Sequence, residues 1–390
     1  MNKQIGILSA LILTLISCGK SDSYEDVLYP NVKAAFGTKI DLENLANYAN
    51  QTVPGYITKS NINGNPITDK GATLGRVLFY DKNLSSNNTI SCASCHQQNN
   101  AFSDVAIASQ GVNGTTGRHS MRLINTRFAA ETKFFWDERA ANLETQTTMP
   151  IKDHGEMGFS GTNGDANFTT LLTKLSAIGY YKELFKFVYG TEEITESKIQ
   201  LALAQFIRSI QSFDSKYDTG RALAANDNAN FSNFTDQENA GKALYMAPPV
   251  FNATGNRTSG GLGCAGCHRA PEFDIDPNTR SNGIGGSIAG GQDFTNTRSP
   301  SLRDLVKTDG TLNGPLMHTA VINSLQAAIG HYGDLTNATA NNTNLDQRLK
   351  PNGMGQKLNL TATEVNSVIA FLKTLSGTNV YTDAKWSNPF

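Results

Sequence analysis

Two copies of a Cys-x-x-Cys-His motif constrain this chain more than any other feature of its sequence. The first copy occupies residues 92–96 and the second occupies residues 264–268. Such a motif attaches a c-type haem: the two cysteines form thioethers with the haem vinyl groups, and the histidine ligates the iron. The predicted haem-binding residues are Cys92, Cys95 and His96 in the first copy and Cys264, Cys267 and His268 in the second.

Other uses of a Cys-x-x-Cys pair fit this sequence poorly. A zinc site would need two further ligands, and neither motif has a second cysteine pair or a closely spaced histidine pair beside it. A thioredoxin-like dithiol does not account for a histidine that follows directly in both copies. We therefore expect two covalently bound c-type haems. The second axial ligand of each iron should then decide between catalysis and electron transfer.

The fifth cysteine, Cys18, ends a short apolar N-terminal segment. A lysine near the start precedes an apolar run over residues 5–16, which is the pattern of a secretory signal peptide. Residues 15–18 resemble the bacterial lipobox, which implies cleavage before Cys18 and a lipid on it; an ordinary signal peptide is the alternative. The run is too short for a convincing membrane span. We expect an exported protein, anchored by lipid to the outer membrane on its periplasmic face.

Charge and length limit the classes of function. The chain has 33 basic and 34 acidic residues and a net charge of −1, which argues against nucleic-acid binding. Its 390 residues exceed one hydrophobic core of ordinary size, so we expect two domains. The sequence predicts a signal peptide over residues 1–17, a tether and lead-in segment over 18–65, an N-terminal haem domain over 66–230 and a C-terminal haem domain over 231–390.

Periodicity and capping signals predict a mainly α-helical, loop-rich fold without convincing strand alternation. Apolar residues recur at helical spacing over residues 195–211, and the threonine that opens this stretch can cap it. Thr235 and Thr361 each begin a capping box that opens a helix in the second half. Gly377 can end the last helix. Residues 220–234 lose this periodicity and are predicted to be a linker between the domains.

Several short segments surround the two motifs in a fixed order. They are residues 74–81, 101–104, 117–120, 135–140, 143–146 and 156–158 in the first half, and 298–304 and 314–318 in the second. In order and spacing they resemble the bacterial di-haem cytochrome c peroxidases and their relative MauG. The resemblance implies two cytochrome-c-like helical domains that meet at an interface. It also implies that the His96 haem is catalytic and that the His268 haem passes electrons to it.

The same resemblance implies roles for three further residues. Glu156 matches the family's acid–base carboxylate, which takes a proton from peroxide and returns it to the leaving oxygen. Gln146 matches the amide that orients peroxide and water, and Trp136 matches the tryptophan between the two haems. Without the resemblance, Glu156 would be interpreted as a solvated surface carboxylate and Trp136 as an ordinary core residue.

The first departure from the family pattern concerns the catalytic haem. Resting members cap this haem with a histidine from the loop after the first motif, whereas residues 111–117 contain none. We therefore expect an open catalytic haem that needs no reductive activation. His119 stands where the family has an asparagine that helps to hold calcium between the domains, so calcium is a doubtful third cofactor. A polar role for His119 at the interface or at a haem propionate is favoured over distal ligation.

The second departure concerns the His268 haem. Members of the family supply a methionine at a fixed interval after the Pro-x-x-His element, which His318 ends here; at that interval this chain has Tyr332. MauG uses a tyrosine there. A tyrosinate ligand stabilises ferric iron, whereas methionine raises the reduction potential. We predict Tyr332 as the second axial ligand, with Met317 and His331 as competitors.

The expected activity is that of a di-haem cytochrome c peroxidase, which reduces hydrogen peroxide to water with electrons from a small cytochrome c or cupredoxin. A MauG-like oxidase acting on a protein or organic substrate is the alternative, favoured by Tyr332 and by the missing distal histidine. An electron conduit without catalysis is a third class. We also expect contact with a membrane, through the lipid on Cys18, and no binding of nucleic acid. A homodimer is a further expected possibility.

Overall fold

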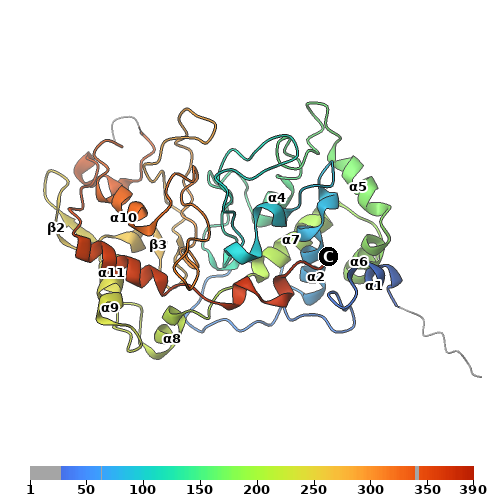
Figure 1. The fold of residues 1–390 in the computed structure, drawn as a ribbon, viewed down its shortest axis with the longest axis horizontal. Helices are drawn as coiled ribbons and strands as arrows, with labels where there is room; N and C mark the ends of the chain where they lie inside the picture. The colour runs from blue at the N-terminus through green and yellow to red at the C-terminus, as the bar shows by residue number, and fades with distance from the viewer. Residues whose placement is uncertain (1–27, 63, 339–341) are drawn as a thin grey trace, which may run out of the picture.

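The computed structural model describes residues 28–62, 64–338 and 342–390. The predicted signal peptide, residues 1–17, and the predicted lipid-bearing Cys18 lie outside the described residues. Short helices and long loops form two lobes that lie side by side, one for each half of the chain (Figure 1). No helix within the described ranges is both long enough and apolar enough to cross a membrane.

The first lobe contains most of the helices. They are α1 (Pro30–Phe36), α2 (Asp69–Tyr80), α3 (Cys92–Cys95), α4 (Leu143–Thr148), α5 (Phe168–Ser176), α6 (Gly179–Tyr189) and α7 (Glu196–Ser209). The second lobe contains α8 (Lys216–Leu223), α9 (Asp236–Met246), α10 (Leu325–Gly333) and α11 (Ala362–Lys373), with the short strands β1 (Pro249–Phe251), β2 (Arg257–Gly260), β3 (His268–Arg269) and β4 (Asp274–Ile275).

Three of the predicted helix starts are confirmed. The Thr195 hydroxyl accepts the backbone N–H of Lys198 at the start of α7. Thr235 and Thr361 form the predicted capping boxes at the starts of α9 and α11. The predicted role of Gly377 is wrong, because α11 already ends at Lys373.

Each lobe is built on a pair of helices that cross at a glycine. In the first lobe α2 packs on α7, and a Cβ at Gly75 would lie 2.0 Å from the carbonyl oxygen of Ala202. In the second lobe α9 packs on α11, and a Cβ at Gly241 would lie 1.8 Å from the carbonyl oxygen of Ser367. Only a residue without a Cβ permits so close an approach of two backbones. The two crossings fix the frame on which each Cys-x-x-Cys-His motif lies.

The strands form two antiparallel pairs that the sequence analysis did not predict. β1 pairs with β2, and β3 pairs with β4. The strands of the second pair have two residues each, which is too short for an alternating pattern to be visible in the sequence. The pair of β3 and β4 matters for function because His268 is the first residue of β3.

The prediction of a linker over residues 220–234 is wrong. Phe231 and Phe234 are buried in the core of the second lobe, where Phe231 lies 5.3 Å from the ring of Tyr217. The Lys242 ammonium on α9 also donates a hydrogen bond to the carbonyl of Asp227 at 2.7 Å. Two buried rings and the Lys242 ammonium therefore hold this polar segment in place. The sequence did not predict these contacts, because periodicity does not detect isolated aromatic residues in a loop.

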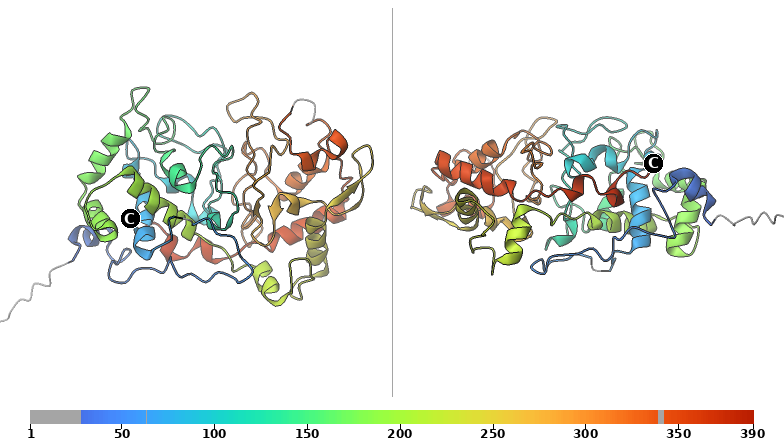
Figure 2. Two further views of the ribbon diagram at one scale, coloured as in Figure 1. Left: turned by 180° about the vertical axis from the view of Figure 1, so that it is seen from behind. Right: turned by 60° about the horizontal axis from the view of Figure 1, so that its bottom comes forward.

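The C-terminal segment returns to the first lobe. Val380 and Trp386 belong to the first hydrophobic core, and the Trp386 indole donates to Ser209 Oγ at 3.3 Å. Arg76 on α2 donates to the carbonyl of Ser387 at 2.7 Å. The segment follows α11 across to a place beside α2, in the front view and from behind (Figures 1 and 2). The predicted domain boundary after residue 230 stays a prediction, since each core takes residues from both sides of it.

Candidate haem centres

The first Cys-x-x-Cys-His motif forms the single helical turn α3, which packs against α2. The Nδ1 atom of His96 lies 3.1 Å from the carbonyl oxygen of Phe102. With the hydrogen on Nδ1, this carbonyl orients the ring and leaves Nε2 as the metal-ligating atom. Burial lowers the pKa of His96, against the carbonyls of Phe102 and Met121, and so favours the neutral imidazole that binds iron.

Glu156 lies in the turn after α4, with its side chain half-buried. Its backbone N–H donates to Asp153 Oδ1 at 2.9 Å, whereas its carboxylate makes no hydrogen bond or ion pair within the described ranges. Burial raises the pKa of Glu156 to about 7; the Asp153 carboxylate adds to the rise, and Arg139 opposes it. A carboxyl group with this pKa can accept and return a proton near neutral pH. Burial raises the pKa of both Cys92 and Cys95, and the Glu156 charge adds to both shifts, which places Glu156 close to the first motif.

The loop that lacks the distal histidine packs directly against the Glu156 turn. The N–H of Val112 donates to the carbonyl of Glu156 at 3.0 Å. A Cβ at Gly111 would lie 2.1 Å from the carbonyl oxygen of Gly155, so the two backbones touch. Residues 111–117 therefore adjoin Glu156 and bring no histidine to it. The open catalytic haem remains a prediction.

Gln146 lies on α4, whose N-terminus is capped by Asn142: the N–H of Thr145 donates to Asn142 Oδ1 at 2.8 Å. The side chain of Gln146 is half-buried. Within the part of the chain that the structure describes, no hydrogen bond joins its amide to Glu156 or to another group. The amide is therefore available to a ligand, and its role in orienting peroxide remains a prediction.

The second Cys-x-x-Cys-His motif leads into the β3–β4 pair. The backbone around His268 is held by the Tyr245 hydroxyl, which donates to the His268 carbonyl at 2.6 Å. The Nδ1 atom of His268 is buried, and no hydrogen bond of normal geometry reaches it from the described residues. Burial lowers the pKa of His268 to about 4, although the nearby carbonyl of Pro300 opposes the shift. A buried neutral imidazole of this kind is suited to metal ligation.

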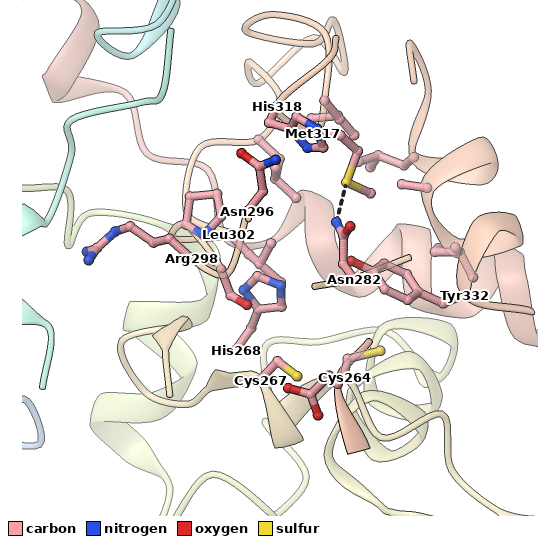
Figure 3. A pocket seen from close by; sticks show the side chains of 18 of the residues that line it. Cys264, Cys267, His268, Asn282, Asn296, Arg298, Leu302, Met317, His318 and Tyr332 are labelled. Carbon is pink, nitrogen blue, oxygen red and sulfur yellow. Dashed lines mark hydrogen bonds between the residues drawn. The ribbon is translucent and has the colours of Figure 1, made fainter. Parts of the chain in front are cut away.

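His268 opens onto a largely apolar cavity of about 180 Å³ that lies in the second lobe and extends to the contact with the first. In Figure 3 the two cysteines lie at one end of this cavity, His268 lies just beyond them, and Tyr332 and Met317 reach in from other sides. The apolar part of its wall includes Leu262, Leu305, Ile329, Leu358, Val368 and Leu372. An apolar cavity with both thioether-forming cysteines and an open imidazole in its wall fits a covalently attached haem.

The three candidates for the second axial ligand of this haem differ in their surroundings. Tyr332 on α10 lines the cavity, and burial raises the pKa of its hydroxyl far above the ordinary value. Met317 also lines the cavity, and its sulfur accepts a hydrogen bond from Asn282 Nδ2 at 3.1 Å (Figure 3). His331 instead borders a separate surface hollow, with Nε2 2.9 Å from the carbonyl of Asn282. These surroundings favour Tyr332 or Met317 over His331; the assignment to Tyr332 remains a prediction.

Trp136 lies where the two lobes meet, at the edge of the His268 cavity. Its indole donates to the carbonyl of His119 at 2.8 Å, and its own carbonyl accepts the N–H of Thr297 at 2.8 Å. Its ring meets His318 edge-on, with centroids 6.2 Å apart. The side chain is 9% exposed. The position at the interface agrees with the location implied for the tryptophan, while its role in electron transfer remains a prediction.

His119 is a structural part of the same interface. Its backbone N–H donates to the carbonyl of His318 at 2.8 Å. Its ring lies against the first lobe, with Nδ1 3.0 Å from the carbonyl of Ala106 and Nε2 3.5 Å from Ser103 Oγ. Burial lowers the pKa of His119 to about 4. Since both ring nitrogens have protein partners, these contacts favour the polar interface role over distal ligation.

Comparisons with known proteins agree with these two sites. The sequence model of the family described as di-haem cytochrome c peroxidase matches residues 69–227. MauG of Methylophilus methylotrophus is 28% identical over 322 residues, which cover 80% of this chain and 84% of that protein. Over most of its length this chain is therefore similar to the di-haem cytochrome c peroxidases and MauG. Cytochrome c551 peroxidase of Nitrosomonas europaea is 27% identical over 312 residues, 78% of this chain and 80% of that protein.

A solved structure extends this likeness over both lobes. The crystal structure of a MauG-like protein associated with microbial copper homeostasis has a TM-score of 0.65 and 26% sequence identity. The match covers 87% of this chain and 99% of that chain. The predicted mainly helical fold with two haem domains is confirmed. By this similarity, the protein is an oxidoreductase with two c-type haems.

Calcium remains a doubtful cofactor of this di-haem protein. In the described part of the chain, no group of three or more His, Cys, Asp or Glu side chains could hold a metal ion. Beside His119, the interface instead holds an ion-pair cluster. Arg118 bonds Asp137 of the first lobe at 2.6 Å and Asp293 of the second at 2.8 Å.

Two residues of the second haem centre were missed in the sequence analysis. Asn282 donates a hydrogen bond to Met317, one of the candidate ligands. It lies in a glycine-rich loop that contains no recognisable motif. Arg122 lines the cavity of His268 although it belongs to the first half of the chain. A basic residue within the apolar run Met121 to Ile124 was the available signal for Arg122.

Proposed function

We propose that this di-haem oxidoreductase reduces hydrogen peroxide to water at the His96 haem, with electrons that enter at the His268 haem from a small cytochrome c or cupredoxin. The observation that carries the proposal is Glu156, a half-buried carboxylate without a protein partner in the described residues and with a pKa of about 7. A haem with an open axial position supplies the site at which peroxide is bound and reduced.

The protein side chains supply the proton chemistry. The ionised Glu156 carboxylate takes the proton from the inner oxygen of peroxide and then donates it to the outer oxygen, which leaves as water. Two electrons and two further protons complete the reduction to two water molecules. The half-buried amide of Gln146 is the proposed donor that orients peroxide for this transfer.

A MauG-like oxidation of a protein or organic substrate is the second candidate. Tyr332 favours it, because a tyrosinate ligand stabilises oxidised iron at the second haem. The side chain of Tyr332 lines the cavity beside His268, as this candidate requires. Under this proposal both haems would store the oxidising equivalents of peroxide for the substrate.

Peroxide consumption by the resting ferric protein tests the first proposal. We expect steady turnover with a reduced cytochrome c or cupredoxin as the donor, without prior reduction of the enzyme, and rapid cyanide binding to one high-spin haem. These results are expected because residues 111–117 bring no histidine to Glu156. Two low-spin haems at rest, or turnover only after pre-reduction, would contradict an open site. Peroxide consumed only with an organic or protein substrate present would favour the MauG-like candidate.

We also propose that the protein is exported and carries a lipid on Cys18 that anchors it to the outer membrane, facing the periplasm. The support is the apolar run and lipobox-like sequence of residues 5–18. We expect the natural protein to fractionate with membranes and a Cys18→Ser variant to appear mainly in the soluble exported fraction. Equal membrane association of the two forms would contradict the lipid anchor.

A further inference from the structure

Arg122 is a half-buried arginine at the contact between the two lobes. Its Nη2 donates to the carbonyl of Ser301, across the interface, at 2.8 Å. Its Nε is buried and has no hydrogen-bond partner among the residues the structure describes, and no ion pair there includes its guanidinium. Burial lowers the pKa of Arg122 to about 10, which still leaves it a cation at neutral pH. The Asp304 carboxylate compensates part of this charge from a distance, but a charge with so few hydrogen bonds is costly unless further groups compensate for it.

Arg122 belongs to the first half of the chain, but its side chain lines the cavity of His268 in the second half. The ring of His96 is instead oriented by the carbonyl of Phe102, 3.1 Å from its Nδ1 atom. The guanidinium of Arg122 is therefore part of the wall of the second haem centre.

A second arginine of the same cavity has a different environment. Arg298 donates to the carbonyl of Lys133 and lies over the ring of Phe134, 4.9 Å from its centroid. These contacts satisfy much of its guanidinium on the side of the first lobe. Arg122 has only the Ser301 carbonyl as a hydrogen-bond partner in the described residues, so its guanidinium is the less satisfied of the two by hydrogen bonds.

We propose that the fixed cation of Arg122 raises the reduction potential of the His268 haem relative to that of the His96 haem. Reduction of a ferric haem adds one negative charge, and a buried cation nearby stabilises the reduced form. The inference rests on the proposed function only for the direction of electron flow from the His268 haem. It requires no contact between Arg122 and substrate.

Potentiometric titration of both haems, followed by their optical spectra, tests this inference. In Arg122→Gln we expect the equilibrium constant for reducing the His268 haem to fall about tenfold, which is 59 mV for a one-electron couple. The potential of the His96 haem should change by less than half as much. Arg122→Lys keeps the charge and should restore most of the difference. If Arg122→Gln fails to fold, Arg122→Met offers a neutral side chain that suits a buried site.

Arg127→Gln is the matched control. It removes the same charge from the same segment, but the Arg127 guanidinium donates to Ser60 Oγ at 3.3 Å and does not line the cavity. Both potentials should remain unchanged in this variant. Equal shifts in the lysine and neutral variants, equal shifts at both haems, or no shift at either would overturn the inference. A selective shift in a protein that does not consume peroxide would support the role of Arg122 and refute the proposed peroxidase function instead.

Discussion

Replacement of Glu156 by glutamine is expected to leave both haems attached and to lower peroxide turnover by about 10²- to 10⁴-fold, the usual contribution of a positioned acid–base group. Glutamine keeps the size of the side chain but cannot take a proton from peroxide. The carboxylate has no protein partner in the described ranges, so its replacement should break no hydrogen bond or ion pair of the fold. The loss should therefore appear in catalysis and not in stability.

The measurement is steady-state peroxide consumption with a reduced donor, together with the haem content and the melting temperature of each variant. Glu192→Gln is the control, because Glu192 is an exposed carboxylate of the same half of the chain. Its turnover should match that of the natural protein. Turnover of Glu156→Gln within a factor of about two of the natural protein would remove Glu156 from the mechanism.

The pH profile gives an independent view of the same group. As a base, Glu156 must be ionised before peroxide binds, so kcat/KM should rise with pH through the pKa of about 7. Asp153→Asn removes the neighbouring charge that contributes to the raised pKa. Its profile should therefore rise at a lower pH, whereas Glu156→Gln should lose this limb.

Replacement of Tyr332 by phenylalanine is expected to change the spectrum of the His268 haem completely. The low-spin spectrum of the natural protein should be replaced by that of a haem with a different ligand set. The phenylalanine ring retains the packing of α10 but has no oxygen to bind iron. The reduction potential of this haem should rise, since a tyrosinate ligand stabilises the ferric form. Electron paramagnetic resonance of the ferric protein reports the ligand change directly.

Met317→Leu is the matched variant for this test, because Met317 lines the same cavity and its sulfur accepts a hydrogen bond from Asn282 at 3.1 Å. It should leave the ferric spectrum unchanged. If the spectrum of Tyr332→Phe matched that of the natural protein and the spectrum of Met317→Leu did not, Met317 would replace Tyr332 as the assigned axial ligand. No matched variant of His331 is needed, because this residue borders a different hollow and its Nε2 lies 2.9 Å from the carbonyl of Asn282.

The parts of the fold that depend on local chemistry were predictable from the sequence. Thr195, Thr235 and Thr361 cap helices through side chain to backbone bonds within one turn, so a short window contains the whole signal. Phe231 could not be placed in this way, because its burial depends on Tyr217 and on Lys242 of α9, which lie outside its own turn. The return of Trp386 to the first core is a contact between the two ends of the described chain and has no local signature.

The same distinction applies to the haem centres. The attachment residues were predictable because thioether formation and ligation need five consecutive positions. Glu156 and Trp136 were identified through the family resemblance, and the structure adds the half-burial of the first and the interface position of the second. Arg122 could not be predicted, since only the packing of one lobe on the other brings it to His268.

The return of the C-terminal segment has a consequence for biogenesis. Val380 and Trp386 complete the core around α2 and α7, and Arg76 on α2 holds the carbonyl of Ser387. During synthesis, the first Cys-x-x-Cys-His motif emerges well before these residues do. The core of the lobe that carries it therefore stays incomplete until the segment after the second motif has also been made. Completion of the first centre is thus coupled to the order in which the polypeptide is delivered.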